Sequence, residues 1–105
     1  MMFFLYTIPT YAHTLVMEGM IVKFLENIIN MKVNGITANE LIKYGKQFDI
    51  HITKKQAEAI SSFVRGKNFD IFNNRDRARI IKEIALVAGA DTAKKVNQLF
   101  LELTK

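Results

Sequence analysis

The sequence predicts an all-α fold, a compact bundle of about five short amphipathic helices. From Val22 onward, apolar residues recur at intervals of three and four, which is the spacing of one face of an α-helix. Only one proline and five glycines interrupt the 105 residues, so long regular elements are favoured. The only alternating stretch, residues 48–53, is short and lies between two helix-start signatures, so we interpret it as a linker.

The first predicted helix begins at Val22 and ends at the sequence Asn34-Gly35. Its apolar residues follow helical spacing and should face the core. These residues are Val22, Leu25, Ile28 and Ile29.

Two capping boxes predict where the second and third helices begin. In each, a Thr hydroxyl accepts from the third helical N–H, and the Glu or Gln at that position reaches back: Thr37 with Glu40, and Thr53 with Gln56. Gly66 is a candidate left-handed terminator of the third helix. The expected inward residues are Leu41, Tyr44 or Gly45, and Phe48 on the second helix, and Ala57, Ile60 and Val64 on the third.

Asparagine and aspartate caps predict the last two helices. Asn73 or Asn74 should cap the fourth helix, Gly89 should end it, and Asp91 should cap the fifth. The expected inner faces are Ile80 or Ile81, Ile84, Ala85 and Val87 or Ala88 on the fourth, and Val96, Leu99, Phe100 and Leu103 on the fifth.

The first 21 residues differ from the rest in charge, since they contain one acid, Glu18, and no Lys or Arg. This apolar leader (residues 1–21) lacks the basic start of a signal peptide, and several polar residues break it as a spanning helix. Met17-Glu18-Gly19 can be encoded with a purine-rich ribosome-binding sequence, and Val22 by the bacterial start codon GUG. We therefore expect an over-called translation start, a leader outside the core and a single helical domain over residues 22–105.

The composition does not point to an enzyme. The chain has no cysteine and two histidines, His13 and His51, neither in a pair with metal-ligand spacing, so we expect no metal. Signatures of phosphate-binding loops, dinucleotide-binding folds and nucleophile elbows do not occur in the sequence. Ser61-Ser62 is interpreted as a small polar face. We expect a protein without catalytic activity and without a cofactor.

One stretch breaks a local rule of helix electrostatics. Fifteen Lys and Arg against ten Asp and Glu give a net charge of +5, and several cations gather where the fourth helix begins. Cations in a first turn oppose the helix dipole by about 0.3–1 kcal/mol each. We name this set the basic surface and predict that it binds an anion or an anionic partner: Arg65, Lys67, Arg75, Arg79 and Lys82. The alternative is that the arginines of this set are solvated and their stems cover Phe69 and Phe72.

A second candidate surface lies on the helix pair over residues 38–48 and 54–65. Its spacing resembles a helix-turn-helix, in which Lys54 and Lys55 at the start of the second helix would contact a nucleic acid. The turn is longer than usual for that motif, and any two adjacent helices of a bundle produce the same pattern.

Residues 22–105 resemble the YqfT-like family of Bacillus-type Gram-positive bacteria, a small domain of unknown function. The resemblance is carried by the Ile52-Thr53 and Gln56-Ala57 spacing, by Arg65-Gly66-Lys67-Asn68 and by Val96-Asn97-Gln98-Leu99-Phe100. It implies a small bacterial cytoplasmic protein and assigns no catalytic residue, ligand or partner.

We therefore expect a small helical binding protein, an adaptor or regulator that presents a surface to a protein partner. The alternative is nucleic-acid binding, through the basic surface or through the helix pair at residues 38–65. We do not expect a membrane role, and the sequence leaves the oligomeric state open.

Overall fold

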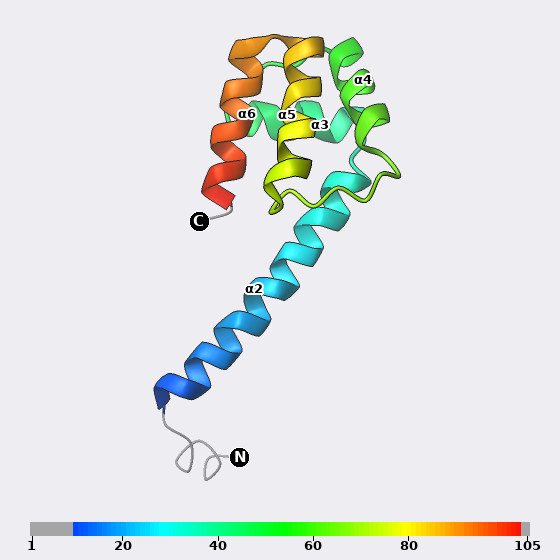
Figure 1. Cartoon of the computed structure of the whole chain (residues 1–105). Coiled ribbons are helices and arrows are strands. Elements are labelled where there is room, and N and C mark those ends of the chain that lie inside the picture. The colour runs from blue at the N-terminus through cyan, green and yellow to red at the C-terminus, as the bar shows by residue number, and fades with distance from the viewer. Residues whose placement is uncertain (1–9, 104–105) are drawn as a thin grey trace.

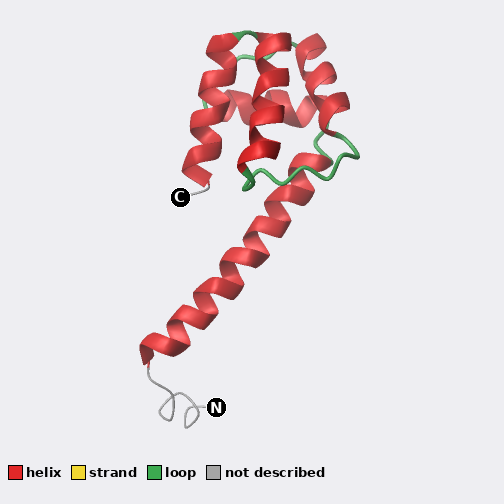
Figure 2. Cartoon of the chain, in the orientation of Figure 1, coloured by secondary structure: helices red, strands yellow, loops and turns green. Residues whose placement is uncertain are grey.

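The structure, a computed structural model, describes the backbone of residues 10–103 and the side chains of residues 19–103. Within these residues all regular elements are helices (Figures 1 and 2), which confirms the all-α prediction. The helices are α2 (Thr10–Asn34), α3 (Ala38–Gln47), α4 (Lys54–Val64), α5 (Asn74–Ala88) and α6 (Ala90–Leu103).

The bundle consists of α3 to α6. Helices α4, α5 and α6 lie side by side, and α3 runs across behind them (Figure 1). Consecutive helices make the main packing contacts, α3 with α4, α4 with α5, and α5 with α6. Helix α2 leads away from this bundle, and the chain extends 57 Å along its longest axis against 25 and 22 Å along the others.

The core lies between α4, α5 and α6 and includes the loop before α5. Ile71 in that loop is fully buried, at 0% exposure. The predicted inward positions Ile60, Val64 and Ile84 are confirmed as buried. The core cluster comprises Ile60, Val64, Phe69, Ile71, Ile80, Ile84 and Ala93. Leu41, Ala85, Val96 and Phe100 pack against it from their predicted faces.

Both predicted capping boxes are confirmed. The Glu40 N–H donates to Thr37 Oγ1 at 3.2 Å, and the Thr37 N–H donates to Glu40 Oε1 at 3.1 Å. The Gln56 N–H donates to Thr53 Oγ1 at 3.2 Å, and the Thr53 N–H donates to Gln56 Oε1 at 3.0 Å. Caps of this kind are worth about 1 kcal/mol each, so these two helix starts are specified locally.

The other predicted boundaries of α4, α5 and α6 are confirmed except one. Asn73 caps α5 by accepting from the Arg75 and Asp76 N–H groups, and Gly89 ends it at φ 96°. Gly66 adopts φ 79°, one residue beyond the extended C-cap of α4. The prediction that Asp91 caps the last helix is wrong. Helix α6 begins directly after Gly89, so Asp91 lies in its first turn.

The prediction for the first helix is wrong in its start and in most of its inner face. Helix α2 already begins at Thr10, so the expected boundary at Val22 falls inside it. Val22, Leu25 and Ile28 are exposed, and only Ile29 packs against the core. The reason is that α2 meets the bundle through its C-terminal turns alone. Residues 1–9 of the leader lie outside the described residues.

Phe48 and Leu103 are exposed rather than inward, since each stands at or beyond the last turn of its helix. Gly45, by contrast, is buried, and the chain turns back on it: the Ile50 N–H donates to the Gly45 carbonyl at 2.7 Å. A Cβ at position 45 would lie 2.7 Å from the Ile50 carbonyl oxygen, so only glycine permits this approach.

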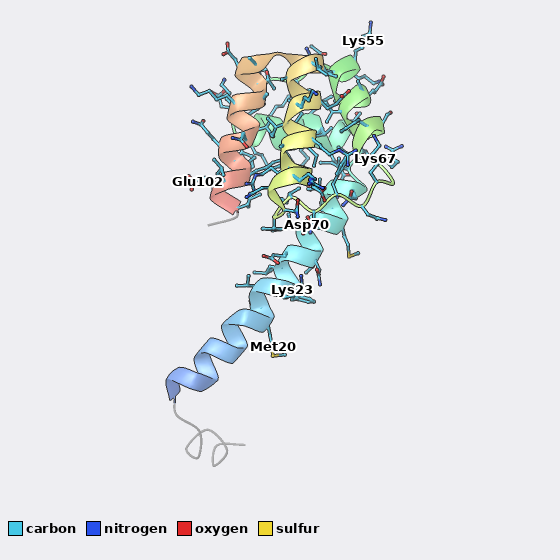
Figure 3. The ribbon with its side chains drawn as sticks, in the orientation of Figure 1. Met20, Lys23, Lys55, Lys67, Asp70 and Glu102 are labelled. Atoms are coloured by element: carbon cyan, nitrogen blue, oxygen red, sulfur yellow. The ribbon has the colours of Figure 1, made fainter. Side chains whose placement is uncertain are left out.

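Two side chains of α2 hold the loop that supplies Phe69 and Ile71 to the core. Asn34 bonds both backbone polar groups of Phe69: it accepts from the N–H and donates to the carbonyl, each at 2.7 Å. Asn30 accepts from the Ile71 N–H at 3.0 Å and donates to Asp70 Oδ1 at 2.9 Å. We call Asn30 and Asn34 the asparagine pair and residues 69–73 the core loop. Figure 3 shows Asp70 beside the C-terminal end of α2.

Side chains of α5 bond two further backbone groups of the core loop. The Asp70 N–H donates to Asp76 Oδ2 at 3.0 Å, and Arg77 donates to the Ile71 carbonyl at 3.1 Å. Within the loop, the Asp70 side chain accepts from the Phe72 N–H at 2.9 Å. Because unpaired buried backbone groups are costly, this set of side-chain bonds lets a loop enter the core.

An ion pair between Lys32 and Glu40 joins α2 to α3. Their hydrogen bond, together with that from the Thr37 backbone, lowers the pKa of the Glu40 carboxyl below its ordinary value. The same bond raises the pKa of Lys32. Both groups are therefore charged at neutral pH, and the bridge is lost as the pH falls through the lowered pKa of Glu40.

The packing predicts a large difference between two apolar truncations. Ile71→Ala should lower the free energy of unfolding by about 2–5 kcal/mol, because the residue is fully buried. Leu86→Ala should change it by less than about 0.5 kcal/mol, because Leu86 is exposed. Urea denaturation measures both. Equal effects at the two positions would contradict the assigned core.

Candidate functional site

All five residues of the basic surface are exposed on the end of α4, the following loop and α5. Among the described residues none of the five forms an ion pair. Arg65 is held against α4, since its guanidinium donates to Ser61 Oγ at 2.9 Å. Ser61 itself is buried and donates to the Ile36 carbonyl at 2.7 Å, so it is a structural residue and not part of a polar face.

Two cations of the basic surface cover a pair of aromatic rings. The rings of Phe63 and Phe69 stack with their centroids 5.6 Å apart. Lys67 Nζ lies 3.6 Å from the Phe63 centroid, and Arg79 Cζ lies 5.0 Å from the Phe69 centroid. Charged head groups of the basic surface therefore lie over Phe63 and Phe69, whereas the alternative interpretation expected arginine stems over Phe69 and Phe72. The cation–aromatic contacts of the described chain do not include Phe72.

The other two cations on α5 stand apart from these rings. Arg75 uses its backbone N–H in the Asn73 cap, and its side chain makes no hydrogen bond to a described residue. Lys82 lies with Arg77 along a shallow groove between α5 and α6. Sequence reasoning missed Arg77, whose role depends on contact with the core loop.

Lys54 and Lys55 belong to a separate region. Figure 3 shows Lys55 and Lys67 at opposite ends of α4, so the two predicted binding regions do not form one surface. Helices α3 and α4 do pack together, joined by residues 48–53, in which Asp49 has a left-handed φ of 58°. No cluster of metal-ligating side chains occurs in the part of the chain that the structure describes.

Most of the exposed large apolar residues in the described part of the chain lie on α2. At about 100° per residue, six apolar residues fall within about 140° of the helix circumference. Their side chains are 46–75% exposed. We call this set the apolar stripe: Met20, Ile21, Phe24, Leu25, Ile28 and Met31.

The apolar stripe faces away from the bundle. Ile29, Val33 and the asparagine pair occupy the opposite side of α2 and contact the core or the core loop. Figure 3 shows Met20 on the projecting part of the helix. The described helices include none with the length and hydropathy of a membrane span. Sequence periodicity had assigned part of this stripe to the core. The spacing of apolar residues on a helix face is the same whether the rest of the chain covers that face or leaves it exposed.

Two comparisons with known proteins find relatives without an assigned function. The model of a family described as protein of unknown function (DUF2624) matches residues 20–104. An uncharacterized protein of Bacillus subtilis (strain 168), YqfT, is 38% identical over 79 residues, which cover 75% of this chain and 94% of that protein. No solved structure matches the chain. The resemblance noted from the sequence is therefore confirmed.

The contacts predict that two arginines of α5 differ in their effect on stability. Arg79→Gln should lower the free energy of unfolding by about 0.5–1 kcal/mol, because it removes the cation that lies over the Phe69 ring. Arg75→Gln should leave it unchanged or raise it by about 0.3–1 kcal/mol, because it removes a cation from the first turn. Urea denaturation of both variants checks this. Indistinguishable values would show that Arg79 has no packing role.

Proposed function

The chain belongs to the DUF2624 family of proteins of unknown function, and we propose that it is a protein-interaction module that docks through α2. The partner is a protein with an apolar helical surface that covers the apolar stripe. The proposal contains no catalytic step, since its chemistry is contact between apolar side chains.

One observation supports the proposal, the exposure of six neighbouring apolar side chains on a helix that the bundle leaves uncovered. The largest apolar patch on a soluble monomer typically has about 300–600 Å² and is often a functional surface. Most of the stability of a helix comes from packing of its apolar face, which α2 lacks over the stripe. A partner on the stripe would supply that packing.

The position of the asparagine pair also favours docking. Asn30 and Asn34 hold the last turns of α2 to the core loop, so the stripe projects from a fixed attachment point. A surface held in this way loses less conformational freedom on binding than a free segment does.

A second candidate function is nucleic-acid binding through the basic surface. The observation in its favour is that these five exposed cations have no ion-pair partner among the described residues. Phosphates would provide such partners, and the chain carries a net charge of +5. Against it, Lys67 and Arg79 already contact aromatic rings, so two of the five charges have a packing role.

Affinity capture from the native host, with and without nuclease, distinguishes the two functions. The baits are the parent chain, the double variant Phe24→Glu/Ile28→Glu in the stripe and the double variant Arg75→Gln/Arg79→Gln in the basic surface. We expect the parent and the arginine variant to capture the same proteins, and the stripe variant to lose them. Nuclease treatment should not release these proteins.

Proteins retained equally by the stripe variant would refute the docking role of α2. Nucleic acid that the parent retains and the arginine variant does not would favour the second candidate. Its affinity for the parent should then fall steeply with salt. In the arginine variant the log–log slope should be smaller by about one unit for each phosphate that the variant no longer binds.

A further inference from the structure

We infer that the partner of the apolar stripe is a second copy of this chain, so that two α2 helices pair along their stripes in a homodimer. The inference rests on the proposed docking role of α2 and names the occupant of that surface.

The spacing of the stripe is that of a helix-pairing seam. Ile21, Phe24, Ile28 and Met31 follow one another at intervals of three, four and three, as the two apolar positions of a heptad do. Met20 and Leu25 widen the seam, and none of the six residues is charged. Lys32 falls within the same arc of α2, at its C-terminal end, but it is paired with Glu40. The six apolar residues therefore meet a copy of themselves without repulsion, although each chain carries a net positive charge.

The bundle leaves room for the second copy. Helix α2 leads away from α3 to α6 (Figure 1), and the stripe lies on the side opposite Asn30 and Asn34. Pairing along the stripe therefore does not compete with the bonds that Asn30 and Asn34 make to the core loop.

The exposed area agrees with a modest dimer interface. If a large apolar side chain has about 100–150 Å² of accessible area, six of them at the observed exposures present on the order of 450 Å². Two paired stripes would bury about 900 Å², and the flanking helix surface would bring the interface to about 1,000 Å², the lower limit for a specific one. An interface at this lower limit is typical of weak, reversible association, so the test covers concentrations around micromolar.

A copy fits the stripe better than a lipid surface does. Helices that lie on anionic membranes carry many Lys and Arg residues on the polar face. The described side chains of α2 include Lys23, Glu26 and Lys32, and Lys32 is paired with Glu40. A two-fold pairing also buries both stripes at once, because the same patch serves both protomers.

Sedimentation velocity of the full chain over about a hundredfold concentration range around micromolar tests the inference. The parent should shift from monomer to dimer. Phe24→Glu/Ile28→Glu places charges in the seam and should raise the dissociation constant at least about tenfold. The control is Val22→Glu, a substitution of the same type at one exposed residue outside the stripe, and it should leave the constant unchanged.

A parent chain that stays monomeric throughout would overturn the inference, as would a double variant that dimerises as tightly as the parent. At concentrations where both chains are monomeric, circular dichroism of the double variant should match that of the parent, which excludes misfolding as the reason that it fails to dimerise. If vesicles of phosphatidylglycerol and phosphatidylcholine bind a monomeric parent, lipid is the occupant and the inference is wrong. A monomeric parent whose protein capture still depends on the stripe would overturn this inference alone and leave the proposed function standing.

Discussion

The bonds between the asparagine pair and the core loop are the interactions on which the rest of the structure depends. Phe69 and Ile71 are among the most buried residues, yet they lie in a loop whose backbone has no helix or strand to pair with. A buried peptide group without a partner costs about 1–3 kcal/mol. Asn30 and Asn34, together with Asp76 and Arg77 of α5, supply those partners from side chains.

The same bonds determine which face of α2 is accessible to a partner. The C-terminal turns of α2 are held to the core loop by polar bonds and to α3 by the Lys32–Glu40 ion pair. The six residues of its apolar stripe are left exposed. Polar side chains thus attach α2 to the bundle, while its apolar side chains stay exposed. The proposed docking role follows from both features.

What the sequence predicted well depended on local chemistry. Thr37, Thr53 and Asn73 cap helices through residues two or three positions away, so their roles are visible in a short window. The asparagine pair was not predictable in this way, because its partners lie 35–41 residues along the chain. The stripe was misassigned because periodicity reveals an apolar face but not what covers it. The basic surface was identified by charge, but its placement over the Phe63 and Phe69 rings required the fold.

The free energy of unfolding of Asn34→Ala tests the central claim most directly, with Asn27→Ala as the matched control. Both residues lie on α2, but Asn27 is exposed and Asn34 bonds the N–H and the carbonyl of Phe69. The account predicts a loss of about 2–4 kcal/mol for Asn34→Ala and less than about 0.5 kcal/mol for Asn27→Ala. Similar small losses for the two variants would show that the core loop holds its place without the asparagine pair, and would contradict the account.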